Sequence, residues 1–127
     1  MSPAQNESQQ ERAHRVLNAA LELKAEEATA LDVRALTSYA DTLILVTGRS
    51  ERHVRSIADA VLSALSKQGE RPLGVEGHDD GSWILVDLGD LILHVFQKAV
   101  REHYDLERLW SDAPRLDVEI DQESALP

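Results

Sequence analysis

Hydrophobic positions between Trp83 and Phe96 predict two strands joined by a tight turn. The first strand, 83–87, alternates between two faces at the spacing of two that a pleated strand requires. The second strand, 91–96, is apolar apart from one histidine, so we expect both of its faces to be covered. Gly89 supplies the backbone freedom that a two-residue hairpin loop needs. The pattern therefore predicts a β-hairpin whose second strand is buried.

This hairpin carries an unusual set of side chains. Trp83, Leu85 and Asp87 share one strand face, and His94 lies in the adjoining strand. An aromatic ring and a carboxylate on one face are typical of a surface that meets a partner. The same pattern also fits a core with one polar corner, in which His94 is a hydrogen-bonded core or interface histidine.

The rest of the chain shows helical and strand periodicity in separate segments. A stripe of apolar residues predicts a helix over 9–27, and alternation predicts a half-buried strand over 29–36. An apolar run predicts a buried strand over 41–47 that contains Leu45. Ser50 is a good N-cap for a helix that ends near Gly69. A short edge strand over 72–76 and a helix over 99–110 complete the set.

The order of these elements predicts an α/β fold. A strand, a helix and a further strand indicate a crossover unit, and the last strands indicate hairpins. We therefore expect a mixed sheet of about five strands flanked by helices. One domain spans 9–112, between a polar leader at 1–8 and an acidic tail at 113–127, both expected to be loose.

Composition narrows the class of protein. A chain of 127 residues fits one domain, and the absence of cysteine excludes disulfides, thiolate zinc sites and cysteine nucleophiles. No apolar run is long enough to cross a bilayer, and the first residues lack the apolar core of a signal peptide. We therefore expect a cytoplasmic protein that has no membrane partner.

The net charge of −10 is the strongest compositional feature. Proteins that bind nucleic acid by themselves gain affinity by neutralising phosphates, so this charge argues against direct nucleic-acid binding. It suits a basic protein partner, or it serves only to keep the protein soluble.

One turn resembles a phosphate site. Gly48, Arg49 and Ser50 connect a strand to a helix N-terminus, where backbone N–H groups can meet an anion. Nucleotidyltransferases also need two metal-binding carboxylates that face one ion. Asp87 and Asp90 are three residues apart with a turn between them, so they cannot alternate along one strand. A capped helix is the more common use of such a turn, and nucleotide binding stays the alternative.

The histidines give no metal or catalytic set. His78 lies in a polar turn beside two aspartates, where three consecutive residues rarely converge on one ion. His53 lies in the first turn of a helix, where the dipole disfavours a positive charge, so we expect a neutral, structural role. No serine–histidine–acid spacing includes His94. We therefore expect no catalytic residue, no metal and no cofactor.

The segment 104–110 is an aromatic and apolar helix face. Leu106, Leu109 and Trp110 share one side of the expected helix, with Tyr104 just before them. Packing onto the sheet is the more common role of such a face, and contact with a partner is the alternative.

Together, these blocks resemble the ribosomal silencing factor family, also called the Iojap-like family. The resemblance covers roughly residues 10–112, and it lies in the ordered set Ala40-Asp41, 47–54, Glu76-Gly77, 83–90, 94–96, Arg101 and 104–110. It implies a fold similar to nucleotidyltransferases without their catalytic carboxylates.

The resemblance also implies a function that is not enzymatic. Such a protein binds ribosomal protein number fourteen of the large ribosomal subunit and blocks joining of the small subunit, which represses translation when nutrients are scarce. A homodimer is implied as well. The expected contact residues are Trp83, Asp87, His94, Tyr104, Leu106, Leu109 and Trp110.

Overall fold

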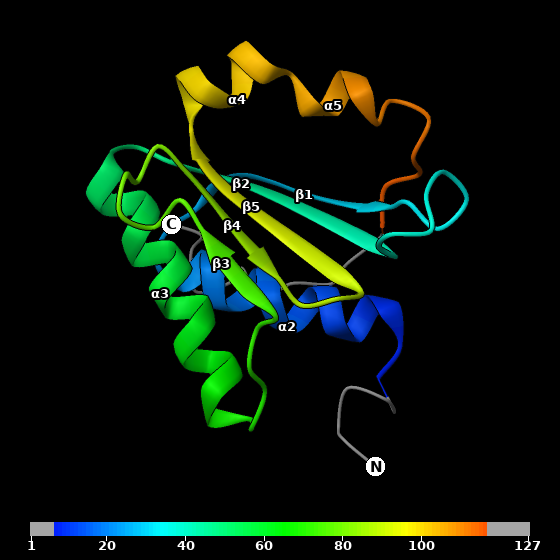
Figure 1. Cartoon of the computed structure of the whole chain (residues 1–127), viewed down its shortest axis with the longest axis horizontal. Helices are drawn as coiled ribbons and strands as arrows, with labels where there is room; N and C mark the ends of the chain where they lie inside the picture. Colours follow the sequence, from blue (N-terminus) through cyan, green and yellow to red (C-terminus); the bar gives the residue numbers. More distant parts are fainter. Residues whose placement is uncertain (1–6, 117–127) are drawn as a thin grey trace, which may run out of the picture.

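The computed structural model describes residues 7–116 and shows one five-stranded sheet between two layers of helices (Figure 1). The elements in chain order are α2 (Gln9–Glu22), β1 (Glu26–Asp32), β2 (Thr42–Gly48), α3 (Glu51–Lys67), β3 (Gly74–Glu76), β4 (Trp83–Asp87), β5 (Leu91–Gln97), α4 (Lys98–Tyr104) and α5 (Leu106–Leu109). The expected mixed sheet flanked by helices is confirmed.

The sheet has the strand order β1-β2-β5-β4-β3. β2 and β5 pair in parallel at its centre, and the other neighbours are antiparallel. The β4–β5 hairpin closes with a hydrogen bond of 2.9 Å from the Leu88 N–H to the Leu91 carbonyl. Gly89 lies in the left-handed region at φ 92°, so the two-residue loop expected from the sequence is confirmed.

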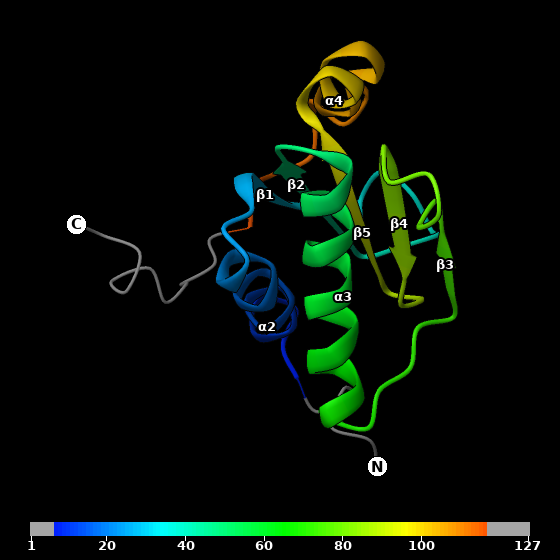
Figure 2. The same cartoon turned by 90° about the vertical axis from the view of Figure 1, so that its left-hand side faces the viewer.

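The two sheet faces have separate hydrophobic cores. Ile44, Val46 and Val95 point toward α2 and α3, which cover one face (Figure 2). Leu45, Ile92 and Phe96 point to the opposite face, below α4 and α5. β2 is buried along its whole length and β5 up to its last residue, as the apolar runs predicted.

The helix α3 forms as expected. The Ser50 hydroxyl accepts a hydrogen bond from the His53 N–H at 3.0 Å, and the helix ends just before Gly69, which has a φ of 77°. Its buried residues are Val54, Ile57, Ala58, Val61 and Leu65.

The first helix and the first strand differ from the expectation. α2 ends at Glu22 and not at 27, because Lys24 adopts a left-handed φ of 62° and the Ala25 N–H bonds back to the Ala20 carbonyl. This bond closes the helix without a glycine. β1 therefore begins at Glu26, before the expected position, and ends at Asp32, where the chain enters a turn over 34–36.

The expected helix over 99–110 is two helices. Asp105 adopts a left-handed φ of 48° between α4 and α5, so the chain changes direction there. Leu106 and Trp110 pack on the sheet core, whereas Leu109 is 71% exposed. The expectation that these three side chains share one packed face is wrong for Leu109.

Structured residues extend beyond the expected domain limits at both ends. Ser8 caps α2 in a reciprocal capping box with Glu11. Near the other end, the Asp32 N–H bonds to the Pro114 carbonyl, and the Leu116 N–H bonds to the Ala30 carbonyl. The remainder of the expected leader and tail lies outside the described residues.

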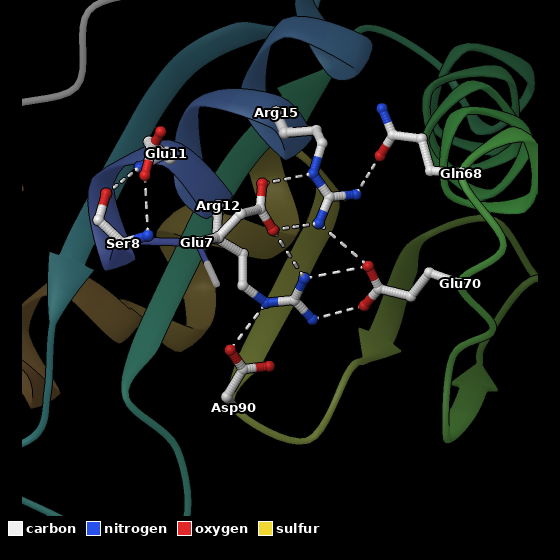
Figure 3. A network of polar contacts seen from close by, with 8 residues as sticks. All are labelled: Glu7, Ser8, Glu11, Arg12, Arg15, Gln68, Glu70 and Asp90. Atoms are coloured by element: carbon white, nitrogen blue, oxygen red, sulfur yellow. Dashed lines mark hydrogen bonds and ion pairs between the residues drawn. The ribbon is translucent and has the colours of Figure 1, made fainter. Parts of the chain in front are cut away.

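A polar cluster ties α2 to two distant loops (Figure 3). Arg12 is buried, and its guanidinium contacts Glu70 at 2.5 Å and Asp90 at 2.7 Å. Arg15 contacts Glu7 at 2.6 Å and Glu70 at 3.1 Å. Burial by itself lowers the pKa of Arg12, but hydrogen bonds to Glu70 and Asp90 raise it above its ordinary value. Arg12 is therefore a permanent cation that joins the helical layer to the β4–β5 turn.

Leu45 tests the placement of the central strand. Its side chain is fully buried, so Leu45→Ala is expected to lower the free energy of unfolding by about 2–5 kcal/mol. Urea denaturation followed by circular dichroism measures this loss. Leu73→Ala is the matched control, because Leu73 is 76% exposed and its truncation is expected to change stability by less than about 0.5 kcal/mol. Equal effects of the two substitutions would contradict the assignment.

Candidate partner-binding site

β4 presents three side chains on the sheet face opposite α2 and α3. Ile84 and Val86 are buried in the core below those helices, so Trp83, Leu85 and Asp87 point to the other side. α4 and α5 cover only part of that side, and all three side chains are half-buried. We call this surface the β4 face. The three side chains share this face, as the spacing of residues in the strand predicted.

Aromatic rings surround Trp83. The centroid of its ring lies 4.9 Å from that of Tyr104, 5.7 Å from Phe96 and 5.8 Å from His94. The Trp83 Nε1–H donates a hydrogen bond of 3.0 Å to Nδ1 of His94. The polar edge of the indole is thus bonded inside the protein, and the half-buried ring exposes only carbon atoms.

His94 supports Trp83 from below. Its side chain is buried, and burial lowers the pKa of His94 to about 4. It therefore remains neutral at pH 7 and can accept the indole hydrogen bond through Nδ1. This position matches the hydrogen-bonded core histidine considered from the sequence, and it makes His94 a support of the β4 face.

Asp87 lies at the other end of β4. It lies four positions after Trp83, which corresponds to about 13 Å along a strand. One carboxylate oxygen of Asp87 accepts a hydrogen bond of 2.8 Å from the Gly89 N–H, so this residue stabilises the hairpin turn. Trp83 and Asp87 therefore share a face but lie at opposite ends of β4.

A small hollow lies beside Trp83. It has a volume of about 230 Å³ and is lined by Glu76, Gly77, Trp83 and Leu85. Glu76 pairs with Leu85 across the sheet, and Leu85 pairs in turn with His94. Glu76 belongs to β3 and borders the β4 face, a position that the sequence pattern did not indicate. Only the strand register, which the sequence does not show, brings it beside Trp83.

The α4–α5 segment borders the face with exposed side chains. Tyr104 is 56% exposed although its ring contacts Trp83, and Leu109 is 71% exposed. Leu106 and Trp110 contribute to the packed layer below. Two side chains of the segment therefore pack as expected, and two others are exposed.

Arg101 holds this segment on the sheet. Its guanidinium donates to the Glu27 carbonyl at 2.7 Å and to the Thr47 hydroxyl at 2.9 Å. It also contacts the Glu107 carboxylate at 2.7 Å and lies 5.6 Å from the centroid of the Phe96 ring. No role of Arg101 could be inferred from its position in the sequence, because its partners come from four separate segments. It positions the α4–α5 segment and, through it, Tyr104.

The turn at 48–50 is already occupied by internal bonds. The Arg49 N–H donates to Nδ1 of His53 at 2.9 Å, and the His53 N–H donates to Ser50. A Cβ at Gly48 would lie 2.8 Å from the Val54 side chain, so close packing explains this glycine. These contacts favour the capped helix over the phosphate site.

The candidate metal ligands also have other roles. Asp87 bonds to the hairpin turn and Asp90 to Arg12, so the two carboxylates do not converge. Nε2 of His78 contacts the Asp59 carboxylate at 2.8 Å, which links its turn to α3. Nε2 of His53 bonds to the Leu23 carbonyl at 2.6 Å, as a structural histidine would. Within residues 7–116, no group of three or more acidic, histidine or cysteine side chains is placed to hold a metal ion.

No helix among the described residues combines the length and apolar character needed to cross a membrane. The fold and the β4 face define an α/β protein with a half-buried aromatic and acidic surface on one side of its sheet. Comparison with known proteins specifies the class further.

The family model described as "Ribosomal silencing factor during starvation" matches residues 6–126, so the chain belongs to this family. A ribosomal silencing factor from Halalkalibacterium halodurans is 38% identical over 112 residues, which cover 88% of this chain and 96% of that protein. One from Chromobacterium violaceum is 42% identical over 89 residues, covering 70% and 73%. The crystal structure of a protein from Chromobacterium violaceum aligns with a TM-score of 0.80 at 37% identity, covering 89% of this chain and 95% of that one. The family expected from the sequence blocks is confirmed.

His94 gives a prediction about pH. Because its pKa in the folded protein is about 4, we expect no titration of its ring between pH 5 and 8 in NMR spectra. The unfolded chain binds a proton at this residue with a pKa near 6.5, so the contribution of neutral His94 to stability is complete above that pH and is lost as the pH falls toward 4. A ring that titrates near pH 6.5 would contradict the bond to Trp83.

Proposed function

We propose that this chain acts as a ribosomal silencing factor. In this proposal it binds the large ribosomal subunit through ribosomal protein number fourteen and blocks association with the small subunit, which represses translation under nutrient limitation. The observation that carries the proposal is the family match over residues 6–126, together with relatives that are named ribosomal silencing factors.

The charge of the chain supports a protein partner. With a net charge of −10, it would repel bare ribosomal RNA but complement a basic ribosomal protein. Direct recognition of a nucleic-acid sequence is therefore not part of the proposal. A location in the cytoplasm follows from this function.

We assign the β4 face as the contact surface. Trp83 and Asp87 contact the partner in this proposal, and Tyr104 and Leu109 extend the surface along α4 and α5. Three further residues support this surface from inside the protein, since they are buried or packed on the sheet core: His94, Leu106 and Trp110. Large aromatic side chains at an interface centre commonly contribute most of its binding energy.

The mechanism is steric and involves no chemical turnover. A domain of this size seated on the large subunit excludes the small subunit from the same surface. Homodimer formation, which the family resemblance also implies, is part of the proposal, and analytical ultracentrifugation of the free protein tests it.

The joining experiment tests the function directly. Purified large and small subunits are mixed with excess protein, and joined ribosomes are followed on a sucrose gradient. We expect fewer joined ribosomes, with the protein in the large-subunit fraction, and no effect of added nucleotide. Unchanged joining while the protein stays on the large subunit would overturn the steric mechanism. Magnesium-dependent nucleotidyl transfer that disappears with Asp87→Asn would support the enzyme alternative.

Trp83→Ala tests the contact surface. We expect it to weaken binding to large subunits by roughly thirtyfold, which corresponds to about 2 kcal/mol. Asp87→Lys is expected to weaken binding too, through repulsion of a basic partner. Co-sedimentation with large subunits measures both effects.

The thermal midpoint separates contact from folding. Two conservative variants serve as controls for these substitutions. Trp83→Phe keeps an aromatic ring but removes the bond to His94, and Asp87→Asn keeps an oxygen acceptor for the Gly89 N–H. A Trp83→Ala protein that remains folded and binds like the parent would exclude the β4 face as the contact surface. A thermal midpoint of Trp83→Ala far below that of the parent would instead show that Trp83 is a core residue.

A further inference from the structure

The hollow beside Trp83 has the composition of a binding site for a long cationic side chain. Its walls are one carboxylate, one indole ring, one aliphatic side chain and one glycine, at Glu76, Trp83, Leu85 and Gly77. We propose that this hollow binds the side chain of an arginine that a basic protein partner presents. This inference rests on the proposed function and names the chemistry that the β4 face recognises.

The charge of Glu76 is available for such a contact. Three carboxylates of the neighbouring turn and helix are engaged, since Asp87 bonds to Gly89, Asp90 to Arg12 and Glu107 to Arg101. Glu76 is exposed, and within residues 7–116 its carboxylate has no hydrogen-bond or ion-pair partner. A guanidinium group would give it a charge-assisted hydrogen bond.

The indole is oriented for a cation. Its N–H is bonded to His94, and Tyr104 and Phe96 pack near the ring, so the part that borders the hollow is carbon surface. Cations are attracted to the face of a tryptophan ring, and the planar guanidinium of arginine stacks there better than the ammonium of lysine. Leu85 offers an apolar wall for the methylene stem.

Gly77 allows β3 and β4 to approach each other closely beside the hollow. Its φ is 83°, and a Cβ at this position would lie 2.0 Å from the Trp83 carbonyl oxygen. The absence of a side chain therefore lets the end of β3 approach the start of β4. This approach places the Glu76 carboxylate and the Trp83 ring around one space.

A free arginine analogue tests the chemistry without the ribosome. N-acetylarginine amide is titrated into the full chain at millimolar concentration, and NMR signals of the Trp83 indole N–H and the Gly77 amide are followed. We expect saturable shifts that Glu76→Gln weakens by several-fold, with no such shifts for N-acetylnorleucine amide. Equal shifts with the norleucine analogue would overturn the cation site, and tighter binding of N-acetyllysine amide would overturn the preference for arginine.

Binding to large subunits tests the role of the site in recognition. Glu76→Gln removes the charge at nearly constant shape, and we expect affinity to fall roughly five- to tenfold, the size of one charge-assisted hydrogen bond at an exposed site. The dependence of binding affinity on salt concentration should also become weaker, because one charge is lost from the contact. Glu22→Gln is the matched control, because Glu22 is exposed on α2, beyond the opposite face of the sheet.

The two experiments separate this inference from the proposed function. If the parent binds large subunits and Glu76→Gln binds equally well, the arginine site is overturned and the proposed function stands. If the parent does not bind large subunits, the proposed function fails, and so does the assignment of a ribosomal protein as the source of the arginine. In that case the analogue titration still decides whether the hollow binds a guanidinium group.

Discussion

The structure depends on the burial of two parallel central strands on both faces. β2 and β5 pair over seven positions, and their side chains point alternately into two different cores. Strands that are apolar on both faces need cover on each side. α2 and α3 provide it on one face and the α4–α5 segment on the other, so the positions of all the helices follow from this one constraint.

Two buried arginines connect these layers at their polar margins. Arg12 joins α2 to the β4–β5 turn and the segment before β3, and Arg101 joins α4 and α5 to β1 and β2. A buried guanidinium is tolerated only where several acceptors surround it, and each of these has acceptors from separate parts of the chain. The position of Tyr104 beside Trp83 therefore depends on Arg101, although Arg101 itself has no exposed role.

The β4 face exists because the cover of the sheet is incomplete. The second core is covered only by the short helices α4 and α5. Trp83, Leu85 and Asp87 are therefore left half-buried at its edge. The bond from the indole to His94 then fixes the direction of the ring. A surface with a rigid ring and the Glu76 carboxylate, which has no partner within residues 7–116, is suited to a basic partner, and the net charge of the chain agrees with this.

The sequence by itself determined the fold class, the buried strands, the capped helix α3, the hairpin and the shared face of Trp83 and Asp87. All of these follow from local periodicity or from single residues such as Ser50 and Gly89, whose effects reach only a few positions. Tertiary structure decided the early end of α2, since Lys24 takes a left-handed conformation that gives no pattern in the sequence. It also decided the break at Asp105, the exposure of Leu109, the contacts of Arg101 and the position of Glu76 beside Trp83. These features depend on strand register and on contacts between distant segments, which the order of residues along one chain does not reveal.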